Sequence, residues 1–439
     1  MSNIDAIGSE VRPSHHPNNE ISFLWKPGLL IAELVCQPDK GLVFAIREAG
    51  NTRYEDRVES FKPLSWLEPL VRAGVLKLPD KAELYGSIDE LARTIRDFIH
   101  RYFDCAPEFE SVATLYVLHT WLYELFGAVP YLRFLGIAGS GKTRGTQTIG
   151  GACYRPMVIG GTSSTASVFR QIEATGGTLL VDEADFNDSK IGSEIGRILN
   201  NGYQRGLPVM RTEKLGDDWV PRPYTVFGPK VINGRQRFRD DATESRCLVH
   251  SPHQTGRADI PRQLPATFHA EALDIRNQAL TWRLEKLDVI QPQEILVPEL
   301  RPRTNEIIMP LLVVAEQFHE PERQRYREEL IAYAKGLDEE SAQIGRDSVE
   351  AMLVNAYVVL CSKGRSRPTC GDVAAAVHGE DDSVRRWLNP RKVSELLRDL
   401  GFTTQHSKRG AEIDIDPQRL AVVCSRYGVS TALQPAMTK

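Results

Sequence analysis

Short apolar runs alternate with amphipathic stretches through the middle of the chain, and this pattern predicts a mixed α/β fold. Between about 130 and 250, the apolar runs are YLRFLG, PMVIG, GTLLVDE, FGPKVIN and RCLVHS. Each is short enough to be one strand, and the stretches between them are long enough for helices. We therefore expect a parallel sheet covered by helices.

The flanking regions have other periods. Upstream, GLLIAELVC and LVFAIREAG surround the turn QPDKG and predict a β-hairpin, with RYEDRVESF as a third strand. Apolar residues at three- and four-residue steps predict a helix from about 87, and a second helix over roughly 109–127 that runs into a strand. From about 266 to 335 the chain is again helical. The tail predicts three helices, a hairpin (TTQHSKRGAEIDID) and a final helix.

Composition limits the class of protein. The chain has 439 residues, which favours two to four domains, and it is 41% hydrophobic and 26% charged. With 54 basic and 58 acidic residues the net charge is −4, which excludes a histone-like polybasic protein but not a local basic patch. Seven scattered cysteines without CxxC or paired Cys/His spacing argue against a zinc site or disulfide framework.

The sequence also predicts where the protein resides. Residues 1–20 are polar, are expected to be disordered and have no apolar signal core. The longest apolar stretch, 114–132, contains His119 and Glu124 and is broken by Gly127 and Pro130, so we interpret it as a buried helix rather than a membrane span. Free thiols fit a reducing compartment. We expect a cytoplasmic protein without a membrane partner.

Residues 136–143, GIAGSGKT, fit the phosphate-loop pattern G-x-x-x-x-G-K-[ST] without a mismatch. An apolar strand precedes this loop and a helix follows it. Glycines allow backbone N–H groups to surround phosphate oxygens, the lysine reaches the β- and γ-phosphates, and the threonine binds Mg²⁺. The alternative is a glycine-rich turn with an exposed lysine. The nucleotide-binding candidates are Gly136, Gly139, Ser140, Gly141, Lys142 and Thr143.

The segment GGTLLVDEADF, 176–186, is an apolar strand that ends in two carboxylates. We expect Asp182 to hold Mg²⁺ through water and Glu183 to polarise the attacking water. Alone, an Asp-Glu pair at a strand end would be a solvated turn. After a phosphate loop, the pair favours an ATP hydrolase.

These motifs, with FGPKVING, ATESRC and PRTNEIIMPLL after them, resemble the AAA+ ATPases. More narrowly, the chain is similar to the helicase-like ATPases of plasmids, prophages and integrative elements, which often stand beside a primase. The resemblance covers roughly 115–335, covers the tail less well and does not cover 1–85. It implies a phosphate-loop core with a helical lid and a C-terminal winged-helix domain.

The resemblance also implies roles for polar residues after the acidic strand. Asn233 would orient the attacking water; alternatively it caps a turn before Gly234. Arg246 would reach the γ-phosphate held by a neighbouring subunit, whereas its structural alternative is a surface salt bridge to Glu244. Arg235, Arg237 and Arg239 are rivals for that role. Arg303, favoured over Arg301, would contact nucleotide of its own chain from the start of a lid helix.

Two regions are candidates for DNA contact. VMRTE and WVPRPYTVF flank KLGDD, and the resemblance implies that this hairpin points into the channel of a ring, with Lys214 near its tip and Arg211 on one arm. Residues 201–250 hold nine basic and six acidic residues, although Asp217 and Asp218 oppose DNA contact. In the tail, the winged-helix candidates for duplex DNA are Arg391, Lys392, Lys408 and Arg409, and a protein-docking role is the alternative.

The sequence thus predicts a ring-forming, ATP- and Mg²⁺-dependent DNA motor, a homo-oligomer and specifically a hexamer, that serves replication of a mobile element with a primase or another replication partner. One alternative is an ATPase switch, such as a helicase loader or defence-system component, without unwinding activity. Another is a DNA-binding module with a degenerate nucleotide site. The expected domains are a disordered tail (1–20), a β-rich region (21–85), a helical linker (86–128), an ATPase core (129–265), a lid (266–340) and a winged helix (345–430).

Overall fold

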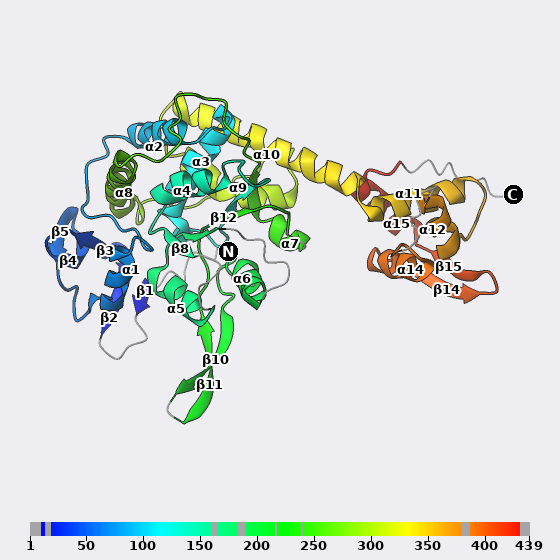
Figure 1. The fold of residues 1–439 in the computed structure, drawn as a ribbon, viewed down its shortest axis with the longest axis horizontal. Coiled ribbons are helices and arrows are strands. Elements are labelled where there is room, and N and C mark those ends of the chain that lie inside the picture. Colours follow the sequence, from blue (N-terminus) through cyan, green and yellow to red (C-terminus); the bar gives the residue numbers. More distant parts are fainter. Residues whose placement is uncertain are drawn as a thin grey trace. The chain divides into compact units, whose positions relative to one another are not determined.

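The computed structural model divides the chain into two compact units, Met1–Lys335 and Gly336–Lys439, here called the N-terminal and C-terminal units. The boundary falls inside one helix, α10 (Glu322–Arg346) (Figure 1). The structure describes residues 10–13, 19–159, 165–182, 190–215, 217–238, 240–378 and 387–430. Among the described residues, no helix combines the length and apolar character needed to cross a bilayer.

A five-stranded parallel sheet lies at the centre of the N-terminal unit, in the order β13-β7-β12-β9-β8. All five strands predicted from the apolar runs are confirmed. They are β7 (Tyr131–Leu135), β8 (Met157–Ile159), β9 (Leu179–Val181), β12 (Lys230–Gly234) and β13 (Cys247–His250). Because the strands are parallel, their carboxyl ends meet at one edge of the sheet, where the glycine-rich loop, Asp182 and Asn233 follow or end β7, β9 and β12.

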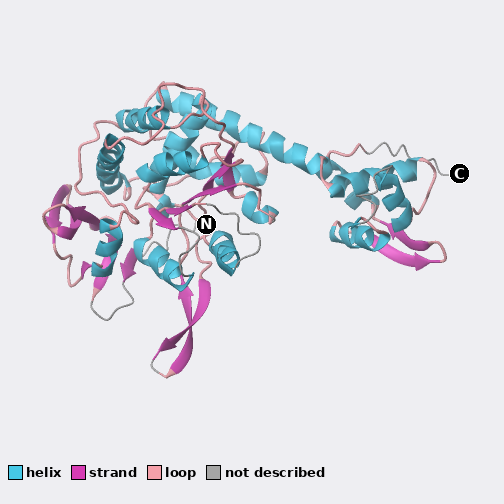
Figure 2. Cartoon of the chain, viewed as in Figure 1, coloured by secondary structure: helices cyan, strands magenta, loops and turns pink. Residues whose placement is uncertain are grey.

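Helices and one hairpin connect these strands. The connecting helices are α4 (Lys142–Ala152), α5 (Thr165–Thr175), α6 (Lys190–Asn201) and α7 (Asp241–Glu244). Between α6 and β12 the chain forms the antiparallel hairpin of β10 (Val209–Leu215) and β11 (Asp218–Tyr224), as predicted. Figure 2 shows this hairpin extending away from the rest of the N-terminal unit.

A second sheet of six strands precedes the core. Its strands are β1 (Glu10–Pro13), β2 (Glu20–Lys26), β3 (Leu30–Gln37), β4 (Gly41–Glu48), β5 (Asn51–Glu55) and β6 (Lys62–Pro63). The predicted hairpin is confirmed as β3 and β4, and a third strand, β5, pairs with β4 but ends at Glu55, six residues before the end of the predicted segment. Four residues of the segment expected to be disordered form β1, whose backbone pairs with β2. A turn of 3₁₀ helix (Ser65–Leu67) and α1 (Glu68–Arg72) follow.

Further helices pack around the central sheet. They are α2 (Ile88–Tyr102), α3 (Pro107–Thr120), α8 (Thr267–Lys286), α9 (Pro302–Ala315) and the first part of α10. Helix α2 begins at a capping box in which Ser87 and Glu90 exchange hydrogen bonds. The buried helix predicted over 109–127 is confirmed as α3, although it ends at Thr120 and a 3₁₀ turn (Tyr123–Leu125) follows. Helix α3 packs against α4 and α9, and α8 packs against α2 and α4.

The C-terminal unit has the predicted order of elements. They are α11 (Val349–Ser362), α12 (Cys370–His378), α14 (Pro390–Asp399), the hairpin of β14 (Thr403–Ser407) and β15 (Gly410–Asp414), and α15 (Pro417–Tyr427). Val393 and Leu397 of α14 enter an apolar core that also includes Leu353 and Ile413. A backbone hydrogen bond from Ile413 to Pro368 attaches the hairpin to the segment before α12.

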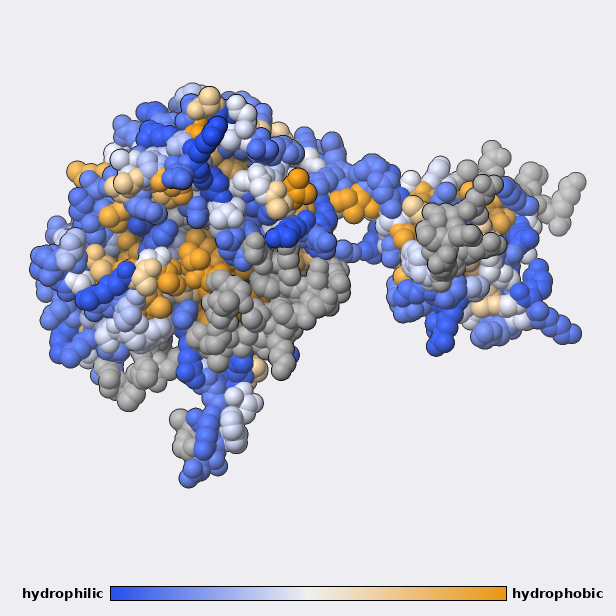
Figure 3. Space-filling view, in the orientation of Figure 1, coloured by the Kyte–Doolittle hydropathy of each residue, from blue (hydrophilic) through white to orange (hydrophobic). Residues whose placement is uncertain are grey.

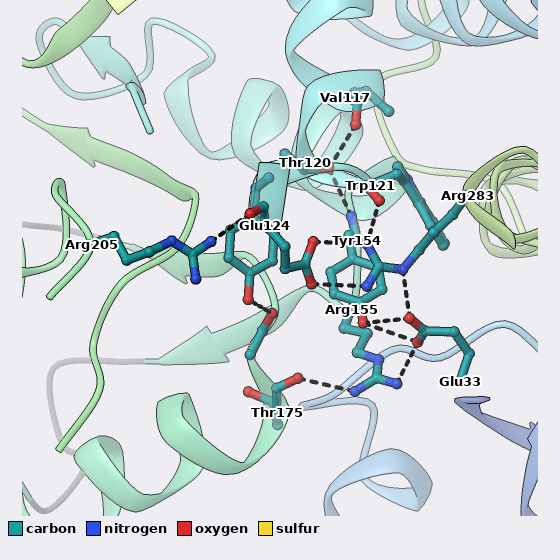
Figure 4. A network of polar contacts seen from close by, with 12 residues as sticks. Glu33, Val117, Thr120, Trp121, Glu124, Tyr154, Arg155, Thr175, Arg205 and Arg283 are labelled. Carbon is teal, nitrogen blue, oxygen red and sulfur yellow. Dashed lines mark hydrogen bonds and ion pairs between the residues drawn. The ribbon is translucent and has the colours of Figure 1, made fainter. Parts of the chain in front are cut away.

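A buried charge network joins the second sheet to the core of the N-terminal unit (Figure 4). Glu33 of β3 accepts from Arg155 and from Arg283 of α8, each at 2.5 Å, and Arg283 also pairs with Glu124 at 2.8 Å. All four side chains are 1% exposed or less. Although burial alone would lower the pKa of Arg283, the carboxylates of Glu124 and Glu33 raise it. The network is therefore held in its charged form.

We predict that Arg283→Met destabilises the N-terminal unit by about 3–5 kcal/mol, because buried Glu124 loses its ion pair and buried Glu33 loses one of its two arginine partners. Urea unfolding measures the loss. The matched control is Arg53→Met, which removes an arginine that pairs with Glu48 at 2.6 Å where both side chains are 51% exposed. That change should cost less than about 1 kcal/mol. Equal effects of the two substitutions would contradict the role given to the buried network.

Candidate functional site

The glycine-rich loop leaves β7 and enters α4 with the backbone geometry of an anion cradle. Gly139 and Gly141 have φ angles of +79° and +99°, in the left-handed region that favours glycine. At Gly136, a Cβ atom would lie 2.9 Å from the Ser140 hydroxyl oxygen. Gly141 is the N-cap of α4, so the first N–H groups of the helix open into the loop.

Polar groups inside this loop are suited to bind an anion. Lys142 Nζ donates a 2.6 Å hydrogen bond to the carbonyl of Ile137, across the loop. The Ser140 hydroxyl is buried and has no hydrogen-bond partner among the described residues. A buried, unpaired hydroxyl beside an ammonium group and a helix N-terminus fits a phosphate group.

Side chains from three segments converge next to the loop. Thr143 Oγ1 lies 3.4 Å from Asp182 Oδ1, and Asn233 Nδ2 donates to the same carboxylate oxygen at 2.5 Å. Asn233 is 1% exposed and its amide nitrogen is also 3.3 Å from Thr146 Oγ1. The side chain of Asn233 therefore faces the site. The hydroxyl and carboxylate oxygens of Thr143 and Asp182 are ligands that suit Mg²⁺.

Two residues named from the sequence cannot be placed in this geometry. Glu183, the expected base, and Arg239 lie outside the described residues. Their roles stay predictions.

Arg246 and Arg303 lie together on one aromatic ring. Their guanidinium carbons are 5.4 and 5.6 Å from the centre of the Tyr203 ring. Arg246 donates to the carbonyl and side-chain oxygens of Asn200 at 3.2 and 3.3 Å. Its alternative partner, Glu244, binds Arg133 instead, and lies 3.5 Å from Arg237.

Two arginines that shape the site were not singled out in the sequence analysis. Arg133 is fully buried in β7, stacks on Phe238 at 3.6 Å and pairs with Glu244. Arg144 in α4 donates to the carbonyls of Pro261 and Arg262 and so holds the segment after β13 beside the loop. Of the two, only Arg133 could have been recognised from the sequence, since a charged residue inside the apolar run YLRFL needs a buried partner.

The hairpin presents one basic and one aromatic side chain near its tip. Lys214 is exposed and pairs across the strands with Trp219, which is 69% exposed. Arg211 is half-buried and lies over the Phe169 ring at 4.6 Å. Asp217 and Asp218 are exposed next to Trp219. Figure 3 shows that hydrophilic side chains cover most of the visible hairpin face.

The four basic candidates of the C-terminal unit lie at two places. Arg391 and Lys392 are in the first turn of α14, which Asn389 caps, and Lys392 pairs with Glu395 at 3.0 Å. Lys408 and Arg409 form the turn between β14 and β15, where both are exposed, and Arg409 pairs with Glu412 at 2.8 Å.

A charged cavity of about 700 Å³ opens elsewhere in the N-terminal unit. No residue of the glycine-rich loop lines it, so it is separate from the site above. Its wall includes Glu110, which accepts from Arg96 at 3.3 Å and lies 2.6 Å from His100. Arg96 and His100, which also line the cavity, therefore pair with Glu110 inside it.

Comparisons with known proteins give only loose likenesses. No protein-family model matches the chain, and no curated protein matches it. Among solved structures, the apo C-terminal region of NrS-1 is 10% identical over 88% of this chain and 96% of that one, with a TM-score of 0.34. Drosophila ORC bound to DNA is 14% identical (82% and 99% covered, TM-score 0.21). Aeropyrum pernix ORC1 in complex with DNA is 13% identical (77% and 97% covered, TM-score 0.22).

A buried lysine fixes the base of the hairpin to the strand that carries Asn233. Lys230 Nζ donates to the carbonyls of Gly202, Val226 and Gly228 at 3.3, 3.0 and 2.9 Å. Gly202 precedes the hairpin, whereas the other two follow it. Burial lowers the pKa of Lys230 to about 7.

We predict that the free energy of unfolding of the wild-type protein rises between pH 7 and pH 10, relative to that of the Lys230→Met variant. In this window the unfolded lysine keeps a proton that the folded one releases, so higher pH favours the folded state by up to about 4 kcal/mol. Urea unfolding of both proteins at pH 7 and pH 10 measures the difference. Parallel pH profiles would show that Lys230 keeps its ordinary pKa.

Proposed function

We propose that this protein is an AAA+ ATPase that forms a ring and acts on DNA, as a replicative helicase of a mobile element. One observation carries the proposal: the glycine-rich loop, Asp182 and Asn233 meet at the carboxyl edge of the parallel sheet. This arrangement supplies a phosphate cradle, metal ligands and an amide beside them.

The chemistry follows from the positions of these side chains. Lys142 would bind the β- and γ-phosphates, and Thr143 and Asp182 would hold Mg²⁺, whose charge offsets that of the phosphates. Glu183 would accept a proton from a water molecule while the water oxygen attacks the γ-phosphorus. The bond between the γ-phosphorus and the β–γ bridging oxygen then breaks, which releases ADP. Asn233 would orient that water.

The position of Arg246 supports a ring. Its backbone carbonyl accepts from the N–H of Tyr131, at the amino end of β7, whereas the glycine-rich loop follows the carboxyl end. Arg246 is therefore on the opposite edge of the sheet from the phosphate cradle of its own chain. An arginine in that place can stabilise transferred phosphate only on a neighbouring subunit, which favours a homo-oligomer such as a hexamer.

The hairpin supports a single-stranded DNA contact in the channel of such a ring. An exposed tryptophan directly opposite a lysine can stack on a base while the ammonium group binds the backbone. We add Trp219 to Lys214 and Arg211 as DNA-contacting candidates. In the C-terminal unit, Arg391, Lys392, Lys408 and Arg409 would bind duplex DNA through phosphates in a winged-helix manner; the alternative is docking of a primase or another replication protein.

The second candidate function is an ATPase switch without unwinding activity. The exposed pair Asp217 and Asp218 favours it, since carboxylates at the tip repel DNA phosphates. Strand displacement on a forked duplex, measured beside ATP hydrolysis, separates the two. Unwinding supports the motor, and hydrolysis without unwinding supports the switch.

We predict that Glu183→Gln lowers kcat for ATP hydrolysis by about 100-fold or more, because a general base is lost, while ATP binding stays within a few-fold of normal. Phosphate release and binding of a fluorescent ATP analogue measure the two effects. Lys142→Ala, which should lose binding as well, is the comparison. Normal turnover of Glu183→Gln would refute the assignment of the base.

We predict that Trp219→Ala and Lys214→Ala each weaken single-stranded DNA binding, by about 5- to 100-fold for the loss of one stacked base. Basal ATP hydrolysis should not change, because neither side chain reaches the nucleotide site. Fluorescence anisotropy with labelled oligonucleotides measures affinity. Lys40→Ala, in the exposed turn between β3 and β4, is the matched control. Unaltered affinity in both hairpin variants would exclude the hairpin as a DNA contact.

A further inference from the structure

Three side chains from separate segments form a cluster at the amino edge of the central sheet. Tyr203 follows α6, Arg246 precedes β13, and Arg303 is in the first turn of α9. Tyr203 is 2% exposed, and its ring lies 6.2 Å from that of Tyr131, the first residue of β7. The backbone carbonyl of Tyr203 accepts from Val129 at 2.9 Å. The position of the ring is therefore set by the start of β7.

The cluster is far from the phosphate cradle of the same chain. The glycine-rich loop starts after Leu135, and a strand rises about 3.3 Å per residue, so Tyr131 is roughly 16 Å from Gly136. Helix α9 packs on α3. Because the guanidinium groups of Arg303 and Arg246 lie by the same Tyr203 ring, the two arginines share one location. The expectation that Arg303 contacts nucleotide of its own chain has no support in this placement.

The electrostatics of the cluster favour an anion. Two guanidinium groups lie by one aromatic ring, where cation–π attraction offsets part of their mutual repulsion. Arg303 pairs with Glu306 at 2.6 Å, but both side chains are 42% exposed, so the pair is weak and can exchange for a stronger anion. Arg246 Nε is buried and has no hydrogen-bond partner among the described residues. A triphosphate presented by another subunit would satisfy both arginines.

We propose that Arg303 acts together with Arg246 on the nucleotide of the neighbouring subunit, and that Tyr203 is the positioning residue for both. This inference rests on the proposed ATPase function and changes the subunit on which Arg303 acts. Both guanidinium groups would stabilise the negative charge of the transferred γ-phosphoryl group. Tyr203 touches no reacting atom. Its ring holds the two arginines side by side at the amino edge of the sheet.

Mixing variant subunits tests the proposal. Arg246→Ala and Arg303→Ala should each lower ATP hydrolysis by about 10-fold or more, as should Lys142→Ala. Lys142→Ala subunits still donate both arginines, and Arg303→Ala subunits still bind ATP. An equal mixture of these two should recover activity, since roughly a quarter of the interfaces in a randomly mixed ring would be intact. Lys142→Ala with Arg246→Ala should recover in the same way.

The decisive mixture is Arg246→Ala with Arg303→Ala. If both arginines come from the same subunit, every interface lacks one of them and activity stays low. If Arg303 served its own chain, this mixture would recover while Lys142→Ala with Arg303→Ala would not, and that pattern would overturn the inference alone. Recovery in no mixture, with an active wild type, would also overturn it. An inactive wild-type chain would contradict the proposed function and with it the inference.

Two further variants separate positioning from folding. Tyr203→Phe keeps the ring and should retain activity, whereas Tyr203→Leu should lower kcat about 10-fold with little change in KM for ATP. Arg323→Ala is the matched control for Arg303→Ala, because Arg323 is also 42% exposed and pairs with Glu320 three residues away. It should be fully active. A loss in Arg323→Ala as large as that in Arg303→Ala, or equal loss in Tyr203→Phe and Tyr203→Leu, would contradict the assigned roles.

Discussion

Parallel pairing of the five central strands is the constraint on which the candidate site depends. Parallel strands give a sheet two unlike edges, one with every carboxyl end and one with every amino end. The glycine-rich loop, Asp182 and Asn233 occupy the carboxyl edge, because each follows or ends a strand. Arg246 precedes β13 and so lies at the amino edge. Under the proposed function, a site that needs both edges would be completed by a second copy of the chain.

Strand β12 connects two features that differ in chemistry. At one end Asn233 donates to Asp182, and at the other Lys230 binds carbonyls on both sides of the hairpin. The strand is buried along its whole length and bonded to β7 and β9, so it does not deform independently of the sheet. The hairpin is thus attached to the element that also carries a residue of the candidate site.

Burial of charge is a recurring feature of the N-terminal unit. One buried network contains Arg283, Glu33 and Glu124. In another pair, Arg133 binds Glu244, which lies two residues before Arg246. Such groups are costly to bury and become tolerable only when each has a partner. Their effect is to fix where elements meet: β3 against α8 in one case, and α7 against β7 in the other.

The sequence by itself determined the five core strands, the hairpins and the residues of the glycine-rich loop, because apolar period and glycine spacing are local properties. It also named Asp182 and Asn233, since each ends an apolar run. It missed the pairing of β1, the charge network of Glu33 and Arg283, and the shared location of Arg246 and Arg303 beside Tyr203. These were decided only by the tertiary structure. Glu33 and Arg283, 250 positions apart in the chain, are brought together by packing, and no local pattern encodes which buried charge or ring will be the partner.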